Sequence, residues 1–343
     1  MTQHQSTPLR SFVAGLSALA LLAVGLAGCG GDDQGPSRQM NMVTVNWIEG
    51  MAMTYMQEQI LENRYDMEVD IREVQGGGTA FVSVASGDRD FFNEAWLPTT
   101  HEQPWEENQD GSKKLGYTYR GTSVGVVVPA YVEADTFPDL TSYQQELDGT
   151  LNGIESGAAI NGQMENTLEL YDMDDAFSVS AASGPANWQA LESAIGDNEP
   201  VAVAGWKPHW KWNRFDIKYV NGAKTGHNVD IWGQPEDIFT IVGDDFIDKF
   251  PREVVCFLQE FEANDEQVGS LMSAFNERGD MSKEEAAAQW IENNPDDVEQ
   301  WTNQAEECAN SDEDLEYLPD DATYSTDQAE MSGQDEMSEQ DEM

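Results

Sequence analysis

Hydrophobic and polar positions recur along the chain with the periods of strands and helices. Residues 42–47 alternate as a strand does, residues 51–63 place apolar side chains at helical spacing, and residues 67–74 return to strand character. A strand–helix–strand opening of this kind is typical of α/β domains. The same criteria predict three more strands and four more helices: strands at residues 123–129, 200–204 and 237–242, and helices at residues 153–171, 251–263, 266–278 and 283–293.

The N-terminal 28 residues have the layout of an export signal. Arg10 precedes an apolar run over residues 12–26, which is shorter than the roughly 20 apolar residues that span a bilayer. The run ends in the letters LAGC, which resemble the lipobox of bacterial lipoproteins. We therefore expect residues 1–28 to be a lipoprotein signal peptide and Cys29 to be lipidated. An ordinary signal peptide followed by an incidental cysteine is the alternative.

Two segments that flank the folded part are poor in large apolar side chains. Residues 29–40, rich in glycine and polar residues, are predicted to be a flexible tether. Residues 311–343 are acidic and end in an imperfect QDEM repeat. Because such a segment cannot bury enough apolar surface to offset its conformational entropy, we expect an acidic disordered tail there.

The charge of the chain is strongly one-sided. Its 343 residues include 65 acidic and 17 basic ones, which gives a formal net charge of -48. Nucleic acid is excluded as a partner on this ground, because binding it requires a basic surface. Like charge at this density repels itself in dilute buffer, whereas molar salt shortens the screening length to about 3 Å. We therefore expect an exported protein of a halophilic organism. No calcium-loop or phosphate-loop motif is present, so neither a metal nor a cofactor is predicted.

Two cysteines remain once Cys29 is assigned to the lipid. Cys256 and Cys308 form an even pair in a compartment that permits disulfides. If bonded, they would close a loop of about 50 residues and restrict the unfolded chain by roughly 4 kcal/mol. Two free thiols are the alternative, and the sequence leaves both open.

Three of the ten tryptophans lie beside short polar signatures in separate segments: Trp47 in VNWIE, Trp96 in AWLPTTH and Trp206 in GWKPHWKW. A quaternary ammonium ion donates no hydrogen bond, so a protein recognises it by placing aromatic faces within about 6 Å of its diffuse charge. Such contacts are each worth roughly 0.5 to 2 kcal/mol when desolvated. This pattern predicts a receptor for a methylated ammonium compound.

These signatures, with VGVVVPAY and GIESGAAI, resemble the substrate-binding proteins of glycine betaine and proline betaine ABC importers. The resemblance extends from about residue 43 to residue 301. It implies an α/β periplasmic-binding-protein fold of type II-like topology, with two lobes and the ligand cleft between them. We accordingly expect residues 41–129 and 229–310 to form lobe 1 and residues 130–228 to form lobe 2.

The family resemblance also assigns the two halves of the binding site. It implies that the ammonium cage consists of Trp47, Trp96 and Trp206. It implies that the ligand carboxylate meets His101 and the backbone amides of Ala159 and Ile160. The amides are physically reasonable donors, because GIESGAAI opens a predicted helix whose first N–H groups and positive dipole end favour an anion. His209 matches a scaffold position in this resemblance and is not assigned to the ligand.

Glu49, two residues after Trp47, keeps a second ligand open. Related choline-binding receptors use an acidic residue at this place against the cation or the alcohol. Choline has no carboxylate, so a choline receptor would not need His101, and such relatives carry a tyrosine near the position of Val124. The presence of His101 and of valine at 124 favours betaine, with a choline receptor of the same fold as the alternative.

The expected function is capture of glycine betaine or a related osmoprotectant outside the cell membrane and delivery to an ABC permease powered by its ATPase. The protein would be a binding module and not an enzyme, anchored to the membrane by lipid at the periplasmic or cell-surface side. One rival is a hydrolase of choline or betaine esters, although no G-x-S-x-G elbow is present. Another is a purely structural acidic lipoprotein, which would show no saturable ligand response.

Overall fold

The computed structural model describes residues 35–220 and 236–322. The chain divides into one unit ending at Gly35 and a second that begins at Pro36, and the folded elements belong to the second. The expected signal peptide, Cys29 and the QDEM repeat lie outside the described residues, as do residues 221–235 around the expected return to lobe 1.

The first lobe is built on a mixed sheet with the strand order β2-β1-β3-β9-β4. The N-terminal strand pairs in parallel with its two neighbours, and β9 runs antiparallel between β3 and β4. The predicted strand–helix–strand opening is present, followed by a second helix and strand. Its elements are β1 (Gln39–Val45), α1 (Ile48–Tyr65), β2 (Glu68–Val74), α2 (Gly77–Ala85), β3 (Phe91–Leu97) and β9 (Glu236–Gly243).

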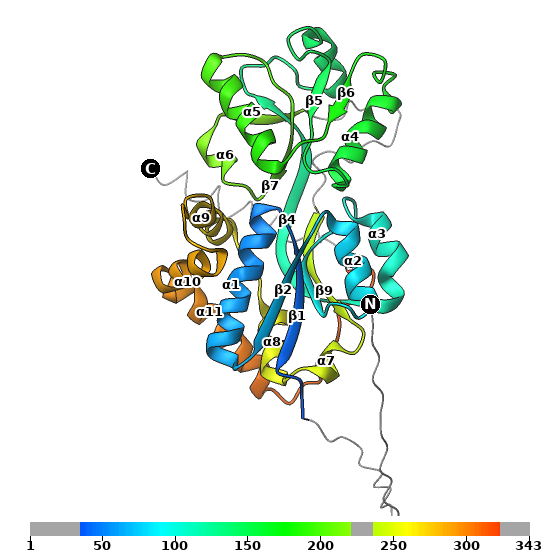
Figure 1. Ribbon diagram of the computed structural model, residues 1–343. Coiled ribbons are helices and arrows are strands. Elements are labelled where there is room, and N and C mark those ends of the chain that lie inside the picture. The colour runs from blue at the N-terminus through cyan, green and yellow to red at the C-terminus, as the bar shows by residue number, and fades with distance from the viewer. Residues whose placement is uncertain (1–34, 221–235, 323–343) are drawn as a thin grey trace, which may run out of the picture. The chain divides into compact units, whose positions relative to one another are not determined.

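The long strand β4 (Ser112–Pro129) connects the two lobes (Figure 1). Its first part pairs with β9, and its second part pairs with β7 and β8. In the second lobe β5 lies parallel to both β6 and β7. The elements of this lobe are η2 (Phe137–Tyr143), β5 (Thr150–Asn152), α4 (Ala159–Leu170), β6 (Ser178–Ser180), α5 (Gly184–Asp197), β7 (Val203–Lys207), α6 (Lys211–Arg214) and β8 (Ile217–Val220).

A group of C-terminal helices packs onto the first lobe, where α9 and α10 contact α1 and α8 contacts β4. A capping box begins α10, because Ser282 accepts from the Glu285 N–H and the Glu285 side chain accepts from the Ser282 N–H. The last helix was not predicted. The remaining elements are α3 (Glu102–Asn108), η1 (Gln109–Gly111), α7 (Phe246–Lys249), α8 (Arg252–Glu260), α9 (Asp265–Asn276), α10 (Lys283–Asn293) and α11 (Pro295–Asn310).

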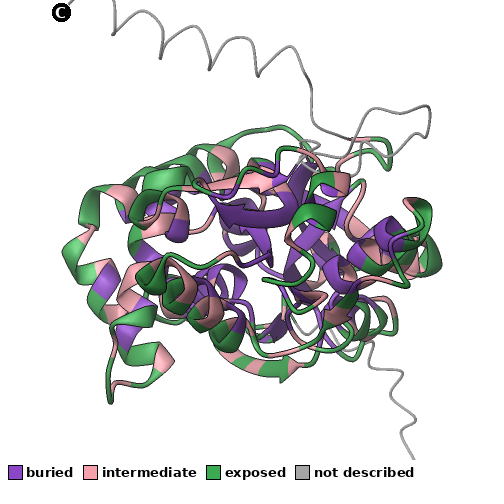
Figure 2. Cartoon of the chain, turned by 90° about the horizontal axis from the view of Figure 1, so that it is seen from above, coloured by how far each residue is buried: buried purple, intermediate pink, exposed green. Residues whose placement is uncertain are grey.

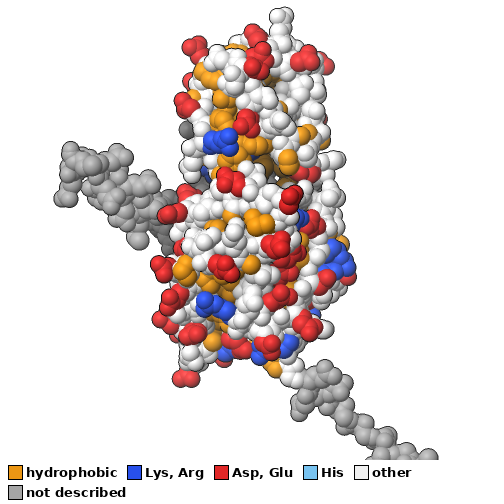
Figure 3. Space-filling model, turned by 60° about the vertical axis from the view of Figure 1, so that its left-hand side comes forward, with side chains coloured by type: hydrophobic (Ala, Val, Ile, Leu, Met, Phe, Trp, Pro, Cys, Tyr) orange, Lys and Arg blue, Asp and Glu red, His pale blue; other side chains and the backbone are white. Residues whose placement is uncertain are grey.

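The central strands β3, β4 and β9 are mostly buried, whereas β2 and β6 are exposed or half-buried. Seen along the view of Figure 2, buried residues gather in the central strands while the outer faces of the helices are exposed. Strand β3 is buried at all seven positions, although it includes Asn93 and Glu94. Acidic side chains are spread over both lobes on the face shown in Figure 3.

Two expectations about the ends of the fold need correction. β1 begins at Gln39, inside the predicted tether, where the Ser37 N–H also donates to the Lys249 carbonyl. The segment after α11 does not become a disordered tail at residue 311. Leu318 donates its N–H to the Lys114 carbonyl, and the Lys114 ammonium donates to two carbonyls near residue 322. The side chains of Leu315, Tyr317 and Leu318 also pack against the hydrophobic core. Residues 311–322 are therefore docked on the folded chain.

The two cysteines that remain besides Cys29 are joined in the structure. Cys256 in α8 and Cys308 in α11 form a disulfide with a Cα–Cα distance of 5.7 Å and a sequence separation of 52 residues. The bond ties the last helix to α8, beside which it packs. The bonded alternative, of the two that the sequence left open, is the one that the structure contains.

Candidate ligand-binding site

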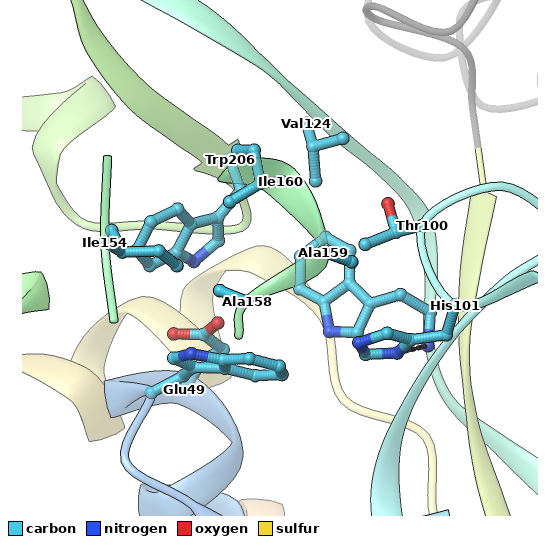
Figure 4. Close-up of a pocket in the computed structure, with 11 residues that line it drawn as sticks. Glu49, Thr100, His101, Val124, Ile154, Ala158, Ala159, Ile160 and Trp206 are labelled. Atoms are coloured by element: carbon cyan, nitrogen blue, oxygen red, sulfur yellow. Dashed lines mark hydrogen bonds between the residues drawn. The ribbon is translucent and has the colours of Figure 1, made fainter. Parts of the chain in front are cut away.

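A cavity lies between the two lobes and is lined by residues of both. Its walls are drawn in Figure 4. The residues that line it are Trp47, Glu49, Trp96, Thr100 and His101 from the first lobe, Val124 from β4, and Ile154, Ala158, Ala159, Ile160 and Trp206 from the second.

The three tryptophans of the predicted cage line this one cavity. Trp47 stands immediately before α1, Trp96 in β3 and Trp206 in β7, and all three are buried. The Trp96 indole N–H donates to Glu94 Oε2 at 2.7 Å, which fixes the plane of that ring. The three rings of the predicted cage therefore come from two lobes, with two rings on the first and one on the second.

His101 lies on the side of the cavity away from Trp206 and Ile154 (Figure 4). Its Nδ1 accepts the backbone N–H of Trp96 at 3.1 Å, so in the neutral ring Nε2 carries the proton. Burial lowers the pKa of His101 from 6.5 to about 4. The imidazole is thus neutral at pH 7 and has one N–H available to donate.

Glycines make room for two buried side chains of the site. A Cβ placed on Gly77, the first residue of α2, would lie 2.6 Å from His101 Nε2. A Cβ placed on Gly50 would lie 2.0 Å from the side chain of Glu94. The glycine run at 76–78 thus begins α2 and leaves room for the imidazole.

The start of α4 lines the same cavity. Ala158 is the residue before the helix, and Ala159 and Ile160 are its first two residues. The first N–H groups of a helix have no acceptor within the helix, and its N-terminus carries a partial positive charge. The structure therefore places two predicted carboxylate donors and His101 around one cavity, together with the indole cage.

Two carboxyl groups lie at the base of the cage. Glu49 and Glu94 are 1% and 0% exposed. Burial raises the pKa of Glu49 to about 7, against the lowering effects of its own backbone, of the Trp206 indole N–H and of Lys211. In Figure 4 the Glu49 carboxylate points toward Trp206, although their contact falls short of hydrogen-bond geometry. Burial, and then the charge of Glu49, raises the pKa of Glu94 well above its usual value.

A buried glutamate holds the loop that carries His101. Glu236, at the start of β9, accepts the backbone N–H groups of Thr99 and Thr100 at 3.3 and 2.8 Å and also the Thr100 hydroxyl. These bonds fix the turn that follows Trp96 and Leu97, and they place Thr100 in the cavity wall. Sequence reasoning did not identify this glutamate, because it is the first residue of β9, beside Asp237, and no motif marks it.

All the residues expected to contact the ligand line this cavity, and Glu49 is among them. Cys29 lies outside the described residues. Residues that were not assigned to the site also line it, namely Thr100, Val124, Ile154 and Ala158. Within residues 35–220 and 236–322, no group of three or more His, Cys, Asp or Glu side chains is placed to hold a metal ion. In the same residues, no helix has the length and apolar character needed to cross a membrane.

Two α/β lobes joined by a crossing strand, with a cavity enclosed between them, define a periplasmic-type substrate-binding protein. The chain belongs to the family described as the substrate binding domain of ABC-type glycine betaine transport systems, whose model matches residues 39–293. This finding agrees with the family resemblance of the sequence motifs.

Individual relatives support the family and the fold. The glycine betaine/carnitine transport binding protein GbuC of Listeria monocytogenes is 31% identical over 175 residues, which is 51% of this chain and 56% of that protein. The chain thus matches little more than half of that relative's length. Lactococcal OpuAC, in its closed-liganded conformation complexed with glycine betaine, is 29% identical with a TM-score of 0.68, covering 77% of this chain and 99% of that one. ProX from Borrelia burgdorferi shares the fold, with a TM-score of 0.70 and 24% identity. The match covers 78% of this chain and 99% of that one.

Proposed function

We propose that this chain is an extracytoplasmic receptor that captures glycine betaine, or a closely related betaine, and presents it to an ABC permease and its ATPase. The observation that carries the proposal is the joining of two kinds of wall in one cavity. Indole faces suit a trimethylammonium group, and N–H donors from His101 and the first turn of α4 suit a carboxylate. A betaine carries both groups on one small molecule.

The hydrogen-bond donors of the site also favour a zwitterion over a simple cation. Neutral His101 offers an N–H in place of a positive charge, and the helix start adds two more N–H groups without a formal charge. Choline would leave these buried donors without an acceptor, which costs binding free energy. A choline receptor remains the second candidate because Glu49, an acid, lines the same cavity.

Export and anchoring form a further part of the proposal. The sequence before residue 29 supports a lipoprotein signal peptide, and acylated Cys29 would hold the receptor at the outer face of the cell membrane. The excess of acidic residues supports a saline habitat, where a buried cage remains effective because salt screens buried charges weakly. Uptake of a betaine would there counter osmotic water loss.

A ligand titration tests the proposal. We would titrate the full-length protein, solubilised in detergent at molar NaCl, with glycine betaine, choline and proline, following heat and tryptophan fluorescence. Saturable one-to-one binding of betaine, with weaker choline and no response to proline, is the expected result. Tighter binding of choline than of betaine would transfer the assignment to a choline receptor. Absence of a response to every quaternary amine would refute the cage.

A further inference from the structure

A lysine ammonium lies against the back of the cage. Lys211, the first residue of α6, is 3% exposed, and its Nζ lies 4.7 Å from the ring centroid of Trp206 and 4.9 Å from that of Trp188. Trp206 lines the ligand cavity but Lys211 does not. The ammonium thus faces the same indole that a ligand cation would contact from the cavity.

The surroundings of Lys211 identify the charges that it balances. Burial lowers the pKa of Lys211 to about 8, and the carboxylate of Glu49 opposes that shift, so the ammonium is charged at pH 7. Burial, with the nearby Lys211 charge, lowers the pKa of His209 well below its usual value, so that imidazole adds no positive charge. Glu155 Oε1 accepts the Gly184 N–H at 2.8 Å, which places this acid at the positive start of α5.

The remaining partners are the two acids at the base of the cage. Glu49 and Glu94 are buried side by side, and each has a carboxyl oxygen without a hydrogen-bond partner among the described residues. Two adjacent buried carboxyl groups do not both ionise readily, so the pair carries at most one negative charge. Lys211, which comes from the other lobe, supplies a positive charge that acts on Glu49.

We propose that Lys211 is a specificity-determining residue, whose ammonium behind Trp206 balances the Glu49–Glu94 pair and makes the cavity select zwitterions over simple quaternary ammonium cations. The inference rests on the proposed function and names the substrate class of that site more closely. A cation in the cage is repelled by Lys211 across the indole, whereas a betaine brings its own carboxylate, which Lys211 attracts. The lysine therefore penalises choline more than glycine betaine.

The size of the penalty follows from Coulomb's law. Two unit charges separated by roughly 9 Å at an effective dielectric constant of about 20 change an equilibrium constant roughly tenfold to twentyfold. For a betaine, attraction of the carboxylate offsets most of this repulsion, so a change below about threefold is expected. The measurable quantity is thus the ratio of the two dissociation constants.

The test replaces Lys211 by methionine, which keeps the length of the side chain without its charge. Loss of Lys211 also makes ionisation of Glu49 harder, so the replacement is measured both alone and in a Glu49→Gln background, where that carboxyl no longer responds. Lys207→Met is the matched control, because Lys207 Nζ lies 4.7 Å from the ring of Trp212, outside the cavity wall. Lys211→Gln serves if the methionine variant does not fold.

Dissociation constants for glycine betaine and choline are measured by calorimetry on the full-length protein at pH 7. In the Glu49→Gln background, Lys211→Met is expected to tighten choline binding roughly tenfold and to change betaine binding less than about threefold. Lys207→Met is expected to leave the ratio unchanged. The inference would be overturned if Lys211→Met and Lys211→Gln left the ratio of the choline and glycine betaine dissociation constants unchanged, in a background variant that binds betaine. Failure of the unmodified protein to bind either ligand would instead overturn the proposed function.

Discussion

The imidazole of His101 stacks on the indole of Trp47, with ring centroids 5.7 Å apart and ring planes inclined by 17°. The imidazole also packs in a T-shaped arrangement with Phe81, with ring centroids 5.4 Å apart. Its Nδ1 accepts the backbone N–H of Trp96. The expected carboxylate donor and a wall of the ammonium cage are therefore one packed unit. A change that displaces one ring should disturb both halves of the site.

Gly77→Ala tests this packing directly. The new Cβ would lie 2.6 Å from His101 Nε2 and displace the imidazole, so glycine betaine should bind at least about tenfold more weakly. Gly78→Ala is the matched control, because a Cβ there meets nothing within 4 Å. Calorimetric titration of both variants measures the effect. Equal betaine affinities in the two would show that the position of His101 does not matter.

Glu49→Gln should stabilise the ligand-free protein in a pH-dependent manner. The pKa of Glu49 is about 7 in the fold against 4.5 in the unfolded chain, so the unfolded state releases its proton first as pH rises. Ionisation therefore costs stability between pH 4.5 and 7, by roughly 2 to 4 kcal/mol when complete. The free energies of unfolding of both proteins should coincide near pH 4 and diverge by that amount at pH 8. Denaturant titrations at molar salt measure these free energies of unfolding. A difference between the two proteins that stays constant from pH 4 to pH 8 would contradict a raised pKa of Glu49.

Reduction of the Cys256–Cys308 disulfide should lower stability without changing ligand affinity. The bond closes a loop across a sequence separation of 52 residues, which corresponds to about 4 kcal/mol in the chain-entropy description. Neither cysteine lines the cavity. Thermal unfolding with and without reductant, and in Cys256→Ser/Cys308→Ser, should show the loss. Identical midpoints under both conditions would argue that the thiols are not bonded in solution.

Cys29→Ser should abolish acylation and release the receptor from the membrane. The LAGC sequence supports lipid attachment at this residue, and two or more acyl chains are needed for stable anchoring. Metabolic labelling with a palmitate analogue, followed by fractionation, measures both properties. The unmodified protein, labelled and fractionated in parallel, is the control, because a replacement of Cys256 or Cys308 would also break their disulfide. If Cys29→Ser still incorporated the label, the lipid would be attached to another residue and acylation at Cys29 would be refuted.

The sequence predicts the ligand-facing residues better than it predicts their supports. The cage tryptophans and His101 stand in distinctive motifs, so their meeting in one cavity could be expected from the family resemblance. Lys211 could not be assigned in this way, because lysine is normally a surface residue and its burial depends on Trp188 from another helix. Glu94 is similarly hidden in an apolar strand, where its partner Trp96 and the room left by Gly50 become apparent only in three dimensions.

The strand–helix order of the first lobe follows from local periodicity, whereas the C-terminal boundary does not. Residues 311–322 are polar on average, but Leu315, Tyr317 and Leu318 supply enough apolar contact to dock them. The Tyr317 hydroxyl also donates to the Asp244 carbonyl and accepts the Ile247 N–H. Composition averages over such a segment and misses the few side chains that hold it.

Binding of glycine betaine after Trp206→Leu tests the central claim most directly. Leucine removes the aromatic face and part of the apolar volume, so at least the cation–π contact of about 2 kcal/mol is lost and the dissociation constant should rise roughly 30-fold or more. Trp210→Leu, in the same segment, half-buried and outside the cavity wall, should change it less than about threefold. We would measure both by calorimetry at molar salt, with circular dichroism as the check on folding. A folded Trp206→Leu protein that binds glycine betaine as tightly as the unmodified one would contradict the indole cage.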